Sequence, residues 1–124
     1  MKVSELIGEQ LSYWVAKAQG WKTQQGGYMA GLNWVNEPPY CVDENGDFKS
    51  AKYRPDQDSA QAFELIEKFG IEVKPIQSRM DGSWYAHCKY YDNYRNNSRV
   101  GSTPQEAICR AVVASVYGEE VNDV

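Results

Sequence analysis

Three stretches of the chain repeat apolar residues at steps of three and four, the spacing that places side chains on one face of a helix. The first stretch predicts a helix over residues 3–19, with Ser4 as its N-terminal cap and Gly20 at its end. Its expected buried face consists of Val3, Leu6, Ile7, Leu11, Trp14, Val15 and Ala18. Because Tyr13 and Trp14 are adjacent, one ring must lie off this face, where it would suit a twofold interface between copies of the chain.

The second apolar stretch predicts a helix over residues 58–70. Asp58 is its expected cap, and Gln61 follows at the spacing of a capping box. The expected buried stripe consists of Ala62, Phe63, Leu65, Ile66 and Phe69. Apolar and polar residues then alternate over 71–76, which predicts a strand, and Pro75 favours an edge position because proline cannot donate to a strand ladder.

The third stretch predicts the C-terminal helix. Thr103 is its expected cap, Pro104 suits the first helical position, Glu106 completes a capping box, and Gly118 ends the helix. The expected packed face consists of Ala107, Ile108, Ala111, Val112, Ser115 and Val116. Residues 119–124 are expected to be a frayed tail.

The segment before the second helix has weaker patterns. Residues 20–39 are expected to form a long loop with one short strand, and residues 40–53 a hairpin around the turn pair Asn45-Gly46. The acidic run 43–47 lacks the ligand spacing of a calcium-binding EF-hand loop. It therefore predicts a solvated turn.

Alternation of side chains predicts a strand over residues 84–91 and a short third strand over 98–101. Together these elements predict an α+β fold, an antiparallel sheet with helices packed on one face, in α-β-β-β-α order after an N-terminal helix and hairpin. We expect one domain, residues 1–124, made of the N-terminal helix (1–20), a loop and hairpin (21–57), the α-β-β-β-α unit (58–118) and the tail (119–124).

Composition excludes several classes of protein. The formal net charge is −4, so the chain is a poor candidate for a general binder of nucleic-acid backbones, which needs clustered cations. The mean hydropathy of −0.66 and the lack of a long apolar run argue against a membrane protein. The first residues lack the pattern of a signal peptide, so we expect a cytoplasmic protein.

Cysteine and histidine offer little catalytic chemistry. The three cysteines, Cys41, Cys88 and Cys109, have no metal-binding spacing and are expected to be reduced thiols, and one histidine cannot anchor a usual zinc site. His87 and Cys88 are neighbours on a predicted strand, where adjacent side chains point to opposite faces, so they cannot form a local nucleophilic dyad. We expect neither a metal nor a cofactor.

Several motifs resemble those of NinX-like phage proteins, a family of unknown function. The motifs are residues 4–8 with Leu11, residues 13–18 with Gly20, and the Thr-Pro pair 103–104 followed by Ala-Ile-Cys-Arg-Ala at 107–111. The family's Tyr-x-Pro-Ser-Thr-Asp-Trp segment is matched at Tyr53, Pro55 and Asp58 only. The C-terminal half also looks like the phage α/β sandwich domain. The resemblance implies a small accessory protein of a phage or prophage, acting in the bacterial cytoplasm.

The order of elements is similar to that of two other kinds of domain. Double-stranded-RNA-binding domains share it, but they carry a Lys-rich segment at the start of the last helix, where this chain has residues 101–106 with an acidic cap. HicB-like antitoxin domains have a Thr-Pro-x-Glu-Ala helix start, which residues 103–107 match. This second likeness implies an inhibitor or partner-binding role.

Aromatic residues are plentiful, with four Trp, nine Tyr and three Phe, which is more than a core of this size needs. Rings can stack on a base, and guanidinium groups can bind a phosphate. The candidate ligand-binding residues are Trp34, Tyr53, Arg54, Trp84, Tyr85, Arg95 and Arg99.

The sequence therefore predicts a non-enzymatic, homo-oligomeric phage binding protein that captures a nucleotide-like ligand to counter host defence. A protein-binding modulator that docks through a sheet edge or the first helix remains the alternative. A hydrolase would need a clustered acid/base set that the sequence does not display.

Overall fold

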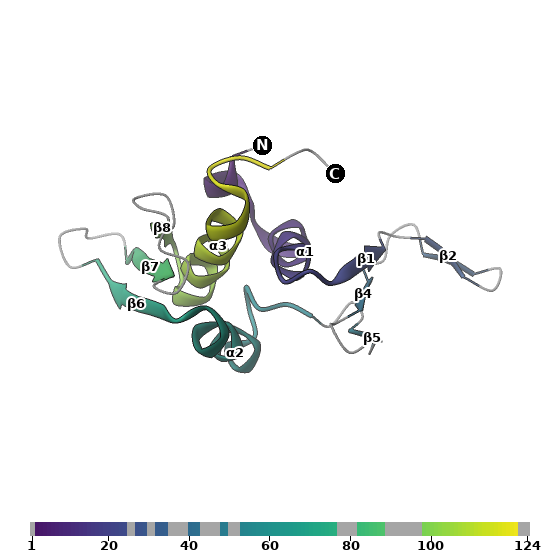
Figure 1. Ribbon diagram of the computed structural model, residues 1–124, viewed down its shortest axis with the longest axis horizontal. Coiled ribbons are helices and arrows are strands. Elements are labelled where there is room, and N and C mark those ends of the chain that lie inside the picture. The colour runs from purple at the N-terminus through teal and green to yellow at the C-terminus, as the bar shows by residue number, and fades with distance from the viewer. Residues whose placement is uncertain are drawn as a thin grey trace.

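The C-terminal helix α3 lies between the other two helices and a three-stranded antiparallel sheet, which confirms the α+β class (Figure 1). The helices are α1 (Gly8–Ala18), α2 (Ser59–Phe69) and α3 (Pro104–Tyr117), and the sheet contains β6 (Ile71–Pro75), β7 (Trp84–Cys88) and β8 (Ser98–Gly101). This computed structural model describes residues 2–24, 27–29, 32–34, 40–42, 48–49, 53–76, 82–88 and 98–121. For the described residues between 22 and 49, the structure describes the backbone and not the side chains.

The predicted N-terminal helix is divided in two. A 3-10 turn, η1 (Val3–Glu5), precedes α1, and Ile7 occupies the N-cap of α1 without a side-chain hydrogen bond, so the prediction that Ser4 caps this helix was wrong. Leu6 and Ile7 have extended backbones, which lets Val3 and Leu6 both face the core and turns Ile7 outward, 62% exposed. Ile7 therefore does not belong to the buried face, although Leu11, Trp14 and Val15 do.

The cap of α2 is the predicted one, but its capping box is not. The Asp58 carboxylate accepts hydrogen bonds from the backbone N–H groups of Ala60 and Gln61. The Gln61 side chain accepts instead from the Arg54 N–H at 2.6 Å, which ties the preceding turn to the helix. Phe63, predicted to be buried, is 59% exposed because the core-facing side of α2 is occupied by Ala62, Leu65 and Phe69.

β6 is an edge strand of the sheet, as Pro75 predicted. The Ile76 N–H donates to the Ser83 carbonyl at 2.9 Å, so this pair is hydrogen-bonded across the β6–β7 ladder. Bonded and non-bonded pairs alternate in antiparallel sheets, which places the backbone groups of Pro75 on the free edge, where its missing N–H removes no ladder bond. Ala86 and Cys88 face the helices and are fully buried. The predicted continuation of the strand over 89–91 lies outside the described residues.

Short strands lie between residues 22 and 49, and those before residue 40 correct the prediction of a long loop over 20–39. They are β1 (Lys22–Gln24), β2 (Gly27–Met29), β3 (Leu32–Trp34), β4 (Tyr40–Val42) and β5 (Phe48–Lys49). β4 pairs with β5, which confirms the predicted hairpin, while its turn at residues 45–46 lies outside the described residues. The described part of segment 20–39 contains three strands rather than one, because β1 pairs with β4 and β2 with β3.

The N-terminal end of α3 agrees with the sequence prediction, whereas the C-terminal end differs from it. Thr103 caps the helix by accepting from the Glu106 N–H at 3.1 Å, as expected. Val116, predicted to pack, is 43% exposed near the C-terminal end. The tail prediction was wrong for residues 119–121, because the Val3 N–H donates to the Glu119 carbonyl at 2.9 Å and Val121 is buried.

Candidate functional site

A polar cleft of about 220 Å³ lies where the N-terminal segment meets the turn after α3. Its lining residues are Lys2, Ser4, Arg99, Glu119 and Glu120. The lining thus combines two cationic side chains, two carboxylates and a hydroxyl group, which is a set suited to a polar, charged ligand.

Backbone contacts between distant parts of the chain build the cleft. Lys2 and Glu120 form an isolated antiparallel bridge, beside the hydrogen bond from Val3 to Glu119. Val3 and Val121 are buried on the inner side of this junction, so apolar packing holds the polar lining in place.

Arg99 enters the cleft from the sheet. It lies opposite Ala86 in the β7–β8 register, and directly paired residues share a face, so its side chain starts on the side of the sheet that α3 covers. Burial lowers the pKa of the Arg99 guanidinium, and the nearby Glu119 carboxylate raises it in part. The group remains charged at neutral pH because arginine starts from a very high value. The cleft therefore contains a charged guanidinium that is partly removed from solvent.

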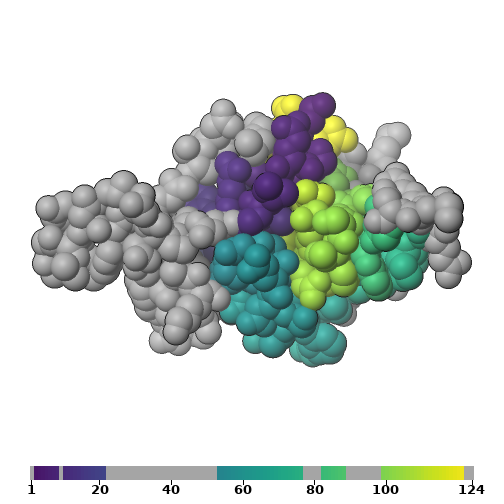
Figure 2. Space-filling model, turned by 180° about the vertical axis from the view of Figure 1, so that it is seen from behind, coloured from purple at the N-terminus to yellow at the C-terminus, as the bar shows by residue number. Residues whose placement is uncertain are grey.

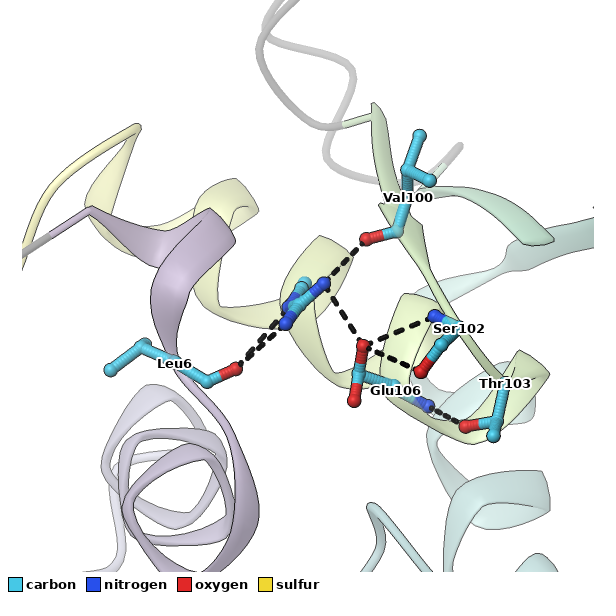
Figure 3. Close-up of polar contacts among 6 residues, drawn as sticks. Leu6, Val100, Ser102, Thr103 and Glu106 are labelled. Atoms are coloured by element: carbon cyan, nitrogen blue, oxygen red, sulfur yellow. Dashed lines mark hydrogen bonds and ion pairs between the residues drawn. The ribbon is translucent and has the colours of Figure 1, made fainter. Parts of the chain in front are cut away.

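Arg110 fixes the elements that carry the cleft residues (Figure 3). Its guanidinium donates to the Leu6 carbonyl at 3.1 and 3.3 Å and to the Val100 carbonyl at 2.9 Å. It also pairs with Glu106 at 3.0 Å, whose carboxylate accepts from the N–H and hydroxyl of Ser102. One nearly buried cation thus joins the N-terminal segment, β8 and the first turn of α3.

Two of the predicted ligand-binding residues, Tyr53 and Arg54, are engaged within the protein. The Tyr53 ring lies 4.8 Å from the Trp21 ring, centroid to centroid, and its hydroxyl accepts from the Gln19 side chain. The Arg54 guanidinium forms a two-point contact with Asp56 at 2.9 and 3.0 Å. This turn contacts α1 through the hydrogen bond from Ser12 to Asp56 and α2 through the hydrogen bond from Arg54 to Gln61.

The other predicted residues do not gather at one place in the described structure. Trp84 and Tyr85 are neighbours on β7 and point to opposite faces of the sheet, and the Lys74 ammonium lies 5.3 Å from the Tyr85 ring centroid. Trp34 ends β3, where the backbone is described, and Arg95 lies outside the described residues. Of the predicted set, Arg99 lines the cleft.

Sequence reasoning missed Lys2, Ser4, Glu119 and Glu120. They lie near the two ends of the chain, and no local pattern shows that these ends meet. Val121 is the residue from which the junction could have been predicted, because an apolar side chain in an acidic tail indicates burial.

The thiols described in the structure are poor nucleophiles. Burial raises the pKa of the Cys88 thiol to about 12, and a hydrogen bond with Ser115 lowers it only in part. The fully buried Cys109 thiol has a pKa well above its ordinary value, first because of burial and then because of the carboxylates of Asp56 and Glu106. Both thiols stay protonated at neutral pH, whereas the thiolate is the reactive form.

Two features are absent from the described part of the chain. It contains no group of three or more His, Cys, Asp or Glu side chains arranged to hold a metal ion. Among the described helices, none combines the length and apolar character that crossing a bilayer requires.

Comparison with known proteins bears on the family rather than on the cleft. A search of curated proteins returned no match. The protein-family model described as "Bacteriophage P22, NinX" matches residues 2–116, which confirms the resemblance seen in the motifs within residues 4–20 and 103–111. The chain therefore belongs to the NinX family of phage proteins, whose function is unknown.

Proposed function

We propose that this phage protein is a non-enzymatic binding protein that captures a small nucleotide-like ligand in the cleft between Lys2, Ser4, Arg99, Glu119 and Glu120. For a phage, such capture would remove a nucleotide signal that the host uses in defence. The class of ligand is the one predicted from the sequence. Of the ligand-binding residues predicted from the sequence, Arg99 is the one that lines this cleft.

The observation that carries this proposal is the partly buried guanidinium of Arg99 at a cleft that also contains Lys2. Burial lowers its pKa, and the nearby Glu119 carboxylate raises it in part, so the guanidinium is partly desolvated where it lines the cleft. A phosphate group entering the cleft could bind the planar guanidinium at two points.

The carboxylates favour a nucleotide over a simple anion. Two cations facing two carboxylates leave the cleft with no net charge, so a phosphate alone would meet repulsion from Glu119 and Glu120. A ligand that carries a phosphate at one end and an amino group on a base at the other can use both kinds of side chain. The Ser4 hydroxyl can donate to the phosphate or accept from the amino group of the base.

Binding without turnover fits the chemistry of the described residues. The buried thiols of Cys88 and Cys109 are protonated at neutral pH, and His87 points to the face of β7 opposite Cys88. The cleft residues themselves provide charges and hydrogen-bonding groups that can hold a ligand.

Isothermal titration calorimetry with cyclic and linear nucleotides tests the proposal. Wild-type protein should bind at least one of them, and Arg99→Gln should weaken that binding about tenfold or more, because a charged hydrogen-bond partner is lost. Lys2→Gln, at an exposed position, should weaken it less and leave folding intact. Lys17→Gln removes the same charge from α1, outside the cleft, and should leave the affinity for the nucleotide unchanged. Absence of binding by the wild type at millimolar nucleotide would contradict the proposal.

A further inference from the structure

The free edge of β6 has an unusual pattern of charge. Its sequence, Ile71-Glu72-Val73-Lys74-Pro75, places opposite charges on either side of the central Val73. Glu72 and Lys74 lie on the sheet face away from α3 and are 44% and 62% exposed at their side chains. The apolar Val73 thus has an acidic residue on one side and a basic residue on the other. Reversing the direction of the strand about Val73 exchanges the positions of the acid and the base.

Among the described residues, no strand pairs with the outer side of β6, and its central backbone groups face that side. Since Ile76 belongs to a hydrogen-bonded pair with Ser83, the alternation of the ladder directs the N–H and C=O groups of Ile71 and Val73 away from β7. β6 is the outer strand in the described sheet order β6-β7-β8. Such an edge is a template for another strand.

From these observations we infer that β6 pairs with β6 of a second copy of this chain, antiparallel and around a twofold axis at Val73. This register sets Glu72 opposite the partner's Lys74 and Lys74 opposite the partner's Glu72. Directly opposed side chains on one face are about 4.5–5.5 Å apart at Cβ, so both pairs attract. The strand is thus complementary in charge to itself in this register.

Pro75 restricts the pairing rather than preventing it. In the register centred on Val73, each Val73 exchanges hydrogen bonds with its copy, and each Ile71 N–H reaches the partner's Pro75 carbonyl. The N–H that Pro75 lacks falls at the periphery of this ladder. A register shifted toward Pro75 would place the missing donor at the centre, so the proline favours the charge-matched register.

The helix layer is consistent with a second copy at this edge. α2 lies on the β6 side of α3, and Figure 2 shows their surfaces side by side. An apolar concavity of about 160 Å³ opens between them, and Phe63, Ile66 and Val73 are among its lining residues. Because Val73 would lie at the twofold axis, the partner approaches this concavity and covers Phe63, which is 59% exposed in the single chain.

Charge reversal combined with a measurement of mass tests the interface. Wild-type protein should sediment with twice the 14.1 kDa chain mass at micromolar concentration. Glu72→Lys alone and Lys74→Glu alone each place like charges opposite one another twice, and should raise the dimer dissociation constant about tenfold or more. Glu64→Lys makes the same charge change at an exposed position on α2 and should leave the dimer intact.

Mixing the two single variants separates pairing between chains from the contact within one chain, where the Lys74 ammonium lies 3.9 Å from the Glu72 carboxylate. The mixture sets two lysines against two glutamates and should restore the dimer, although neither chain has regained its internal pair. The double variant Glu72→Lys/Lys74→Glu should dimerise as the wild type does. A monomeric wild type at several hundred micromolar, or a mixture that stays monomeric, would overturn the inference.

Discussion

The guanidinium of Arg110 donates two hydrogen bonds to the carbonyl oxygen of Leu6, a residue 104 positions earlier in the chain. The same side chain reaches the Val100 carbonyl, next to Arg99. Arg110 therefore connects the N-terminal segment that carries Lys2 and Ser4 to the strand that carries Arg99. The geometry of the cleft depends on this connection, although Arg110 does not line it.

Replacing Arg110 by Met should destabilise the protein by about 3 kcal/mol, because it leaves the Glu106 carboxylate and two backbone carbonyls with fewer donors. For a domain of this size, thermal unfolding should shift down by about 10 °C. Glu64→Gln, at an exposed position, serves as the control and should change stability by less than about 0.5 kcal/mol. Equal melting temperatures for Arg110→Met and the wild type would contradict the assigned role.

Gly101 allows β8 to lie close against α3. A Cβ atom at this position would meet the Ala107 backbone nitrogen at 2.5 Å and the Glu106 carbonyl carbon at 2.9 Å. Gly101→Ala should therefore cost about 1–3 kcal/mol through overpacking. Gly20→Ala provides a comparison, since Gly20 has a positive φ but open space around it, so only backbone strain of about 1 kcal/mol is expected. Urea unfolding of both variants measures the difference, and a smaller loss at Gly101 would argue against close packing.

Asp56 binds Arg54, a predicted ligand-binding residue that lies outside the cleft. A variant at Asp56 can therefore test whether Arg54 takes part in nucleotide binding. The Asp56 carboxylate accepts from the Ser12 hydroxyl at 2.6 Å and binds Arg54 at two points. Asp56→Asn should lower the free energy of unfolding by about 1–3 kcal/mol by weakening these charged hydrogen bonds. The affinity for a nucleotide should not change, because neither residue lines the cleft. Calorimetry on the folded variant checks this, and altered affinity would restore Arg54 as a ligand-binding residue.

The Cys88 thiol makes the free energy of unfolding depend on pH in the alkaline range. Burial raises its pKa in the folded protein from an ordinary value of 9.0 to about 12. Between pH 9 and about 12 the unfolded chain loses the thiol proton while the folded chain keeps it, so the free energy of unfolding falls as pH rises. In Cys88→Ala this contribution is absent, and the fall measured by urea unfolding across that window should be shallower. Parallel slopes for the two proteins would contradict the raised pKa.

Local signals in the sequence predicted the elements whose caps and stripes act over a few residues. Thr103 and Asp58 cap their helices as expected, and Pro75 lies on a sheet edge. The errors occur where a distant contact overrides the local pattern. Leu6 continues an apolar periodicity, yet its carbonyl is bound by Arg110, and the backbone there is extended rather than helical.

The candidate site was harder to predict for the same reason. Residue type suggested Arg54 and Arg99 equally, but only the folded structure distinguishes an arginine paired with Asp56 from one that lines a cleft. Lys2 and Glu119 contribute through the meeting of the chain ends, which no short pattern encodes. The tail residue Val121 contained the relevant signal, because an apolar side chain near a terminus gains stability when it is buried.

The most direct test of ligand capture at the cleft is a titration of isotopically labelled protein with nucleotide, followed by two-dimensional NMR. The predicted result is a saturable change in the signals of Val3, Ser4 and Glu119 and in the Arg99 side chain, with the signals of Tyr53 and Arg54 unmoved. Saturable changes confined to residues outside the cleft, or no changes at millimolar nucleotide, would contradict ligand capture at the cleft.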